Sequence, residues 1–65
     1  MPLNTDPNIS DPDGFYDDLL AAHDGLTKAE SDALNARLIL ILCNQIGDRD
    51  VIRAALAAAR PQQGL

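Results

Sequence analysis

The sequence predicts an all-α fold, a small three-helix unit with an extended N-terminal arm and a central, mostly apolar second helix. Three observations lead to this prediction. Six consecutive apolar side chains fill residues 38–43, helix-capping residues flank that run on both sides, and mostly good helix formers lie between the caps. We therefore expect an extended arm at residues 1–10, a helical domain at 11–60 and a frayed C-terminus at 61–65.

The N-terminal arm contains residues that disfavour a helix. Pro2 and Pro7 push the residues before them out of the helical region. Leu3 and Ile9 are the large apolar side chains of this segment after Met1. Two interpretations stay open. The segment is either a disordered tail, as chain termini often are, or an arm that lies on a neighbouring chain and is anchored by Leu3 and Ile9.

The first helix is expected at about residues 12–24. Asp11 suits the N-cap, and Pro12 suits the first helical position, where its missing N–H leaves no hydrogen bond unmade. Gly25 should end the helix. One face should be apolar and the opposite face acidic. The apolar face holds Phe15, Tyr16, Leu19, Leu20, Ala22 and His23, and the acidic face holds Asp13, Asp17 and Asp24.

The second helix is expected at about residues 28–46. Thr27 and Glu30 have the Ser/Thr-x-x-Glu spacing of a capping box, which satisfies backbone N–H groups at a helix start. Gly47 is well placed as a left-handed C-cap. No proline and no glycine interrupts the stretch between these caps.

The second half of this helix is apolar nearly all round. Successive residues of a helix turn by about 100°, so six apolar positions in a row sweep the whole circumference. The polar line that remains is Glu30, Arg37 and Asn44, spaced by seven residues. A helix that is apolar on most sides needs neighbours on most sides, and a chain this short supplies two at best. We therefore expect the third neighbour to be another protein chain.

The third helix is expected at about residues 49–60. Asp48 suits its N-cap, Asp50 places a negative charge in the first turn, and Pro61 should stop it. Its basic side should lie away from its apolar face. We call this basic side the basic stripe and the acidic face of the first helix the acidic stripe, and both are either solvated or complementary to a partner. The apolar face holds Val51, Ile52, Ala55, Leu56, Ala58 and Ala59, and the basic stripe holds Arg49, Arg53 and Arg60.

The acidic composition disfavours several classes of partner. A net charge of −5 disfavours nucleic acid, which needs a basic footprint, and an anionic membrane surface. The apolar run is far shorter than the roughly 20 residues that span a bilayer. The N-terminus lacks the basic and apolar regions of a signal peptide. We expect a cytoplasmic, bacterial-type protein that binds neither nucleic acid nor membrane.

No catalytic, metal or cofactor site is expected. The single His23 and the single Cys43 give no zinc-site spacing, and a lone cysteine in an apolar run behaves as a small hydrophobe. His23 lies near a helix C-terminus, where the dipole favours it, and lacks an obvious partner nucleophile. A unit this small is not expected to enclose a ligand cavity of roughly 300–1,000 Å³. On its own, the chain is not expected to be an enzyme.

Three segments carry a family resemblance: DPDGFY at residues 11–16, LNARL at 34–38 and NQIGDRDV at 44–51. Together they resemble a family of short bacterial proteins, domain of unknown function family 2783, over about residues 8–59. These segments are helix caps and core positions, so the resemblance implies a fold and supplies no catalytic residues. Members of the family look like small companions encoded near flavin-dependent aromatic hydroxylases and other catabolic enzymes, so the resemblance implies an enzyme of that kind as the partner.

Three classes of function follow. The first is a small non-catalytic accessory subunit that docks through its apolar central helix on a larger protein, such as a flavin-dependent aromatic hydroxylase. The second is a stand-alone homodimer in which the second helix packs on its symmetry mate. The third, an acidic antitoxin or nucleic-acid mimic, is disfavoured because acidic and basic residues are segregated. The sequence leaves open which face of the second helix is the interface. The expected interface residues are Leu38, Ile39, Ile41, Leu42, Leu3, Ile9, Arg49 and Arg53.

Overall fold

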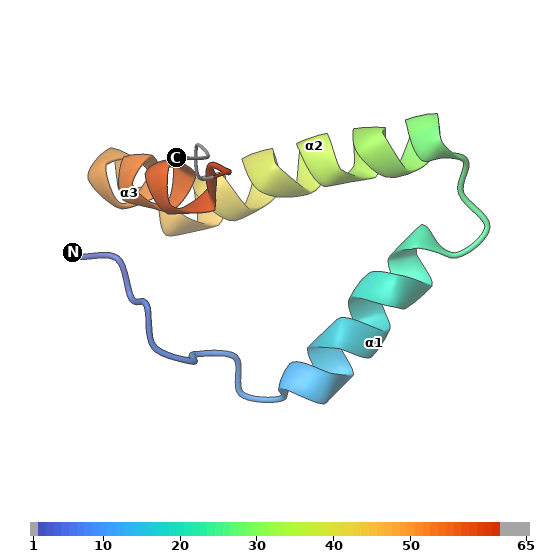
Figure 1. Ribbon diagram of the computed structural model, residues 1–65, viewed down its shortest axis with the longest axis horizontal. Helices are drawn as coiled ribbons and strands as arrows, with labels where there is room; N and C mark the ends of the chain where they lie inside the picture. The colour runs from blue at the N-terminus through green and yellow to red at the C-terminus, as the bar shows by residue number, and fades with distance from the viewer. Residues whose placement is uncertain (1, 62–65) are drawn as a thin grey trace.

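The computed structural model describes residues 2–61 and contains three α-helices, with no strand in that range. The all-α, three-helix prediction is therefore confirmed, and each helix begins and ends within one residue of its expected bounds. The helices are α1 (Pro12–His23), α2 (Lys28–Ile46) and α3 (Arg49–Ala59), coloured from blue-green to orange in Figure 1.

The start of α1 is capped by Asp11, as expected. Its Oδ1 accepts a hydrogen bond from the backbone N–H three residues later, at 3.1 Å, and Pro12 occupies the first turn. The helix ends at His23, one residue earlier than expected, because Asp24 already has an extended backbone. Gly25 follows with a φ of 76°. Glycine adopts this left-handed conformation without the steric cost of a Cβ, so the chain turns there toward α2.

Both ends of α2 are formed by the predicted caps. The Thr27 hydroxyl accepts a hydrogen bond from the Glu30 N–H at 3.2 Å, and Glu30 Oε1 accepts one from the Thr27 N–H at 3.0 Å. At the other end, Gly47 has a φ of 74°, and its N–H donates to the Cys43 carbonyl oxygen at 2.9 Å. These local bonds fix the bounds of the helix without help from the rest of the chain.

A two-residue connection separates α3 from α2. Asp48 caps α3, because its Oδ1 accepts hydrogen bonds from the N–H groups of Asp50 at 2.9 Å and Val51 at 3.3 Å. The helix ends at Ala59, and Arg60 is already extended, with a ψ of 140°. A residue that precedes a proline avoids the helical region, so Pro61 accounts for this end.

The three helices do not close into a compact bundle. α1 and α2 diverge from their connection like the two sides of a V, and α3 lies beside the C-terminal end of α2 (Figure 1). The Cα radius of gyration is 14.0 Å, whereas a compact chain of this length has a radius of about 11 Å. The open arrangement leaves much of α2 uncovered.

Few side chains are buried. Within residues 2–61, Val51 is the one buried hydrophobic side chain, at 7% exposure, whereas Leu40 and Ile41 in the middle of α2 are 71% and 65% exposed. The accessible surface is 5997 Å², and a compact monomer of this mass exposes about 2,000 Å² less by the size scaling of folded proteins. The single chain therefore leaves large apolar side chains of α2 uncovered.

The arm over residues 2–10 forms neither a helix nor a strand, and it runs from α1 back toward the end of the molecule that holds α3 (Figure 1). Leu3 is half-buried and Ile9 is 53% exposed. The arm as an anchor on a neighbouring chain stays a prediction. Met1, expected in the arm, and residues 62–65, expected to fray, lie outside the described residues.

Candidate interaction site

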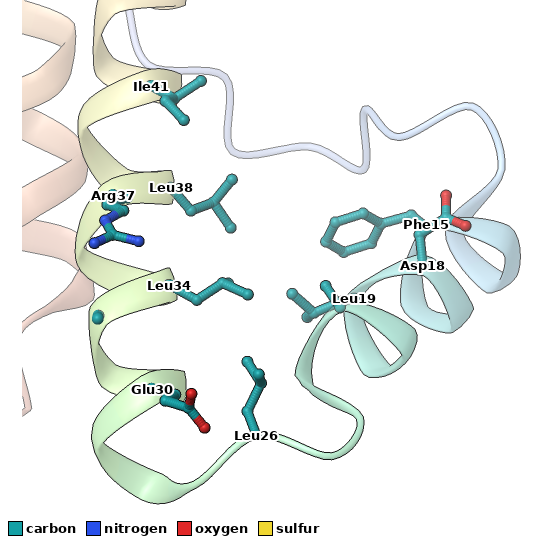
Figure 2. Close-up of a pocket in the computed structure, with 11 residues that line it drawn as sticks. Phe15, Asp18, Leu19, Leu26, Glu30, Leu34, Arg37, Leu38 and Ile41 are labelled. Atoms are coloured by element: carbon teal, nitrogen blue, oxygen red, sulfur yellow. The ribbon is translucent and has the colours of Figure 1, made fainter.

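An apolar groove lies between α1 and α2, and we call it the hairpin groove. Its volume is about 810 Å³. In Figure 2, side chains of the two helices point toward one another across the groove and leave space between them, with Leu26 near its narrow end. The hydrophobic lining consists of Phe15, Leu19, Ala22, Leu26, Ala33, Leu34, Leu38 and Ile41.

The two walls of the hairpin groove have the same spacing of apolar residues. On α1 the wall consists of Phe15, Leu19 and Ala22, at positions i, i+4 and i+7. On α2 the same spacing recurs in Leu34, Leu38 and Ile41. This spacing keeps side chains on one face of a helix. Each wall is therefore a continuous apolar stripe about two turns long.

Three charged side chains stand at the rim of the hairpin groove: Asp18, Glu30 and Arg37. Glu30 Oε1 already accepts the capping hydrogen bond from the Thr27 N–H at 3.0 Å. Among the described residues, neither Asp18 nor Arg37 forms an ion pair. An occupant of the groove therefore meets apolar walls with charges of both signs at the edge.

The corner of the V is held by a side-chain contact. His23 Nδ1, in the last residue of α1, lies 3.0 Å from Ser31 Oγ, in the first turn of α2. Both side chains are half-buried. This contact joins the two helices at the narrow end of the hairpin groove, where Leu26 also lies, and so limits how the walls separate.

A second, smaller groove lies between α2 and α3, and we call it the C-terminal groove. Its volume is about 250 Å³, and no charged residue lines it. Cys43 is half-buried there, with a free thiol. The other lining residues are Ile39, Leu42, Ile46, Ile52, Ala55, Leu56 and Ala59.

The two grooves lie on opposite faces of α2. Ile41 lines the hairpin groove and Ile39 lines the C-terminal groove. Two residues apart on a helix means about 200° of rotation, which points the two side chains in nearly opposite directions. Figure 2 shows α1 and α3 on the two sides of α2 accordingly. Leu40, between these two positions, lines neither groove.

Comparison with known families gives one match. The model of the family described as Protein of unknown function (DUF2783) matches residues 3–61, which is nearly the whole chain. The chain belongs to the DUF2783 family. No curated protein and no solved structure matches it. The family assignment predicted from the three segments is therefore confirmed, and the family's description assigns no activity.

The structure distributes the expected interface of this DUF2783 chain over several surfaces. Leu38 and Ile41 line the hairpin groove, whereas Ile39 and Leu42 line the C-terminal groove. Leu3 and Ile9 lie on the arm, and Arg49 and Arg53 are exposed on α3. The four expected residues of α2 therefore lie on two separate apolar surfaces, and the other four line neither groove.

Sequence reasoning did not assign the α1 wall to the interface. It placed Phe15, Leu19 and Ala22 on an apolar face, as the structure does, but it did not include them among the expected interface residues. Phe15 is 45% exposed, so this core is not closed within the chain. The matching i, i+4, i+7 stripe on α2, which starts at Leu34, is the sequence signal that pairs the two walls.

The acidic and basic stripes do not pair with each other. Their side chains are all exposed, and no ion pair joins the two sets among residues 2–61. The acidic stripe lies on α1 and its C-cap and the basic stripe on α3 and its C-cap, and the two helices lie on opposite sides of α2. The acidic residues are Asp13, Asp17 and Asp24, and the basic residues are Arg49, Arg53 and Arg60.

The described residues also bear on metal binding, membrane crossing and ligand enclosure. Within residues 2–61 no group of three or more His, Cys, Asp or Glu side chains is placed to hold a metal ion. None of the three described helices has the length and apolar character that crossing a bilayer requires. The hairpin groove, at about 810 Å³, falls in the size range of ligand pockets, which was not expected for so small a chain. It is, however, an open space between two diverging helices (Figure 2).

Proposed function

We propose that this DUF2783 protein is a cytoplasmic, non-catalytic interaction subunit that docks through its apolar helix α2 on a larger protein. The observation that carries the proposal is the near absence of buried side chains in residues 2–61, where Val51 is the one buried hydrophobic residue. Exposed apolar surface of this extent is typical of chains that bury it against a partner.

The C-terminal groove is the surface we assign to the larger partner. Its large side chains Ile39, Leu42, Ile46 and Leu56 are 54%, 51%, 43% and 56% exposed. Full burial of one such side chain contributes roughly 1.5–3 kcal/mol, so completing the burial of these four contributes about 3–6 kcal/mol. Association costs about 4–15 kcal/mol. A tight complex therefore needs further contacts, for which Leu40 and the arm are available.

The basic stripe beside this groove supports a particular kind of partner surface. Arg49 and Arg53 are exposed on α3, next to residues that line the groove. An acidic patch on the partner would meet them, which accelerates encounter and fixes orientation more than it adds affinity. A flavin-dependent aromatic hydroxylase or another catabolic enzyme is the first candidate, on the strength of the family resemblance.

The proposal is tested first by recovering the chain with its partner and then by measuring binding between the two purified proteins. The tagged chain is recovered from its own host, the protein that accompanies it in stoichiometric amount is identified by mass spectrometry, and both are expressed separately. Calorimetry should then give a one-to-one complex of subunits. Ile39→Asp should weaken it by at least about 100-fold, because an unpaired charge at an apolar contact is costly.

Two further variants test whether the loss of binding is specific to the C-terminal groove and its basic stripe. Asp17→Asn lies on the acidic face of α1, away from both grooves, and should bind as the wild type does. Arg53→Glu should slow association at low ionic strength more than at high. Recovery of the chain without a stoichiometric companion, or unchanged binding by Ile39→Asp, would refute the proposal.

A further inference from the structure

We infer that a second copy of this chain fills the hairpin groove, through antiparallel pairing of two α2 helices about a two-fold axis near Ala33 and Leu34. The groove needs an occupant with an apolar stripe, because both of its walls are apolar and diverge. α2 itself carries such a stripe in Leu34, Leu38 and Ile41. Each α2 would then lie in the groove of the other copy and beside the other α1.

Most groove residues of α2 match one another in reverse order, although Leu38 falls opposite Ala29, which does not line the groove. The two-fold axis lies midway between positions 33 and 34. Two residues of the antiparallel helices therefore lie at the same height when their numbers have the same sum as 33 and 34. Ala33 then faces Leu34 of the second copy, and both residues line the hairpin groove. Ile41 reaches the level of the connection before α2, where Leu26 of the second copy lines the groove. The small Ala33 at the axis allows the two helices to approach closely.

The charges at the rim become complementary in the same arrangement. Glu30 and Arg37 are seven residues apart, lie on one line of the helix and line the groove together. Their midpoint is the same axis, so Glu30 of each copy lies level with Arg37 of the other. A carboxylate accepts hydrogen bonds at two oxygens, and capping uses only Oε1 of Glu30. Two symmetric ion pairs therefore form without loss of the helix caps.

The excess exposed surface of the single chain is larger than the area that a standard dimer interface buries on each partner. A standard interface buries about 800 Å² on each partner. The chain exposes about 2,000 Å² more than a compact monomer of its mass, on the size scaling for folded proteins. Ile41 and Phe15, from opposite walls of the groove, are 65% and 45% exposed in the single chain and become covered in the pair.

The dimer is compatible with the proposed function but does not depend on it. The C-terminal groove lies on the opposite face of α2, so Ile39 and Leu42 stay accessible to a larger partner while the hairpin groove is filled. Leu40 lines neither groove and stays accessible as well.

Three neighbouring substitutions in the full chain test the pairing by analytical ultracentrifugation over a range of concentrations. The wild-type protein should sediment as a dimer. Ile41→Asp should raise the dimer dissociation constant by at least about 100-fold. Leu40→Asp and Ile39→Asp should leave it within about three-fold. A monomer at all concentrations, or a dimer that Ile41→Asp does not weaken, overturns the inference.

Cross-linking tests the register in case Ile41→Asp impairs folding. In a Cys43→Ser background, Ala33→Cys is placed near the axis, so a short bismaleimide should join two copies. Asn44→Cys should not cross-link, because the two thiols would be separated along the helices by about 21 residues, or roughly 32 Å. Cross-linking at Asn44→Cys would indicate parallel pairing and overturn the inference. Failure of the larger partner to bind would leave both results unchanged.

Discussion

His23 Nδ1 and Ser31 Oγ lie 3.0 Å apart and join the last residue of α1 to the first turn of α2. The contact connects two helices that otherwise diverge, and it lies at the narrow end of the hairpin groove. The angle of the V therefore depends on a polar contact as well as on apolar packing.

Loss of this contact should destabilise the protein slightly. Ser31→Ala removes the hydroxyl and should lower the free energy of unfolding by about 1 kcal/mol, the usual net contribution of one hydrogen bond. The measurement is urea unfolding followed by circular dichroism at one fixed protein concentration. Ser10→Ala, on the exposed arm, is the matched control and should change nothing. Equal effects of the two substitutions would assign no role to the corner contact.

The capping box should contribute more to the stability of the protein than its exposed position suggests. Thr27→Ala removes the oxygen that accepts from the Glu30 N–H at 3.2 Å and should cost about 1 kcal/mol of stability. Thr5→Ala in the arm removes the same hydroxyl from a segment without a helix and serves as control. Thermal unfolding monitored at 222 nm compares the two (roughly 4–8 °C per kcal/mol for a domain this small). A melting temperature unchanged by Thr27→Ala would contradict the assignment.

The turn after α2 should tolerate asparagine better than alanine. Gly47 has a φ of 74°, where a residue with a Cβ is strained by about 1–2 kcal/mol. A Cβ there would lie 3.9 Å from the nearest atom, the Asn44 carbonyl oxygen, so the cost comes from the backbone and not from a clash. Gly47→Ala should therefore destabilise α2 and α3, and Gly47→Asn should do so less, because asparagine accepts this conformation more readily. Equal unfolding midpoints for the two variants would count against this account.

The surface ion pair of α2 should contribute little. Lys28 Nζ lies 2.8 Å from Asp32 Oδ2, but the two side chains are 90% and 62% exposed. Pairs of this kind, four residues apart on a helix, contribute about 0.3–0.5 kcal/mol, and salt screens them. Asp32→Asn should change the free energy of unfolding by less than about 0.5 kcal/mol, and the difference should shrink at 1 M salt. A larger effect would mean that Asp32 has a role outside the single chain.

The helix ends could be predicted from the sequence because they depend on neighbouring residues. Asp11, Thr27 and Asp48 each accept a backbone hydrogen bond within three residues, and Gly47 adopts the left-handed conformation that it was expected to adopt. The bond partners follow directly from sequence spacing. α1 and α3 each end one residue earlier than expected, because Asp24 and Arg60 are already extended.

The grooves could not be predicted in the same way. Helical periodicity places Leu38 and Ile41 on one face and Ile39 and Leu42 on another, but it does not give the angle between α1 and α2. That angle depends on contacts between residues distant in the chain, such as His23 with Ser31. The sequence therefore indicated that α2 has more apolar surface than the chain covers, without indicating that Phe15 and its neighbours leave an open wall.

The half-buried thiol of Cys43 in the C-terminal groove gives the protein a built-in reporter. Alkylation by a maleimide should proceed in the isolated chain and slow when a larger protein covers that groove, because the reagent needs access to the sulfur. Dimerisation through the opposite face of α2 should leave the rate unchanged. A single labelling time course on the unmodified chain can thus tell whether an added protein covers the C-terminal groove.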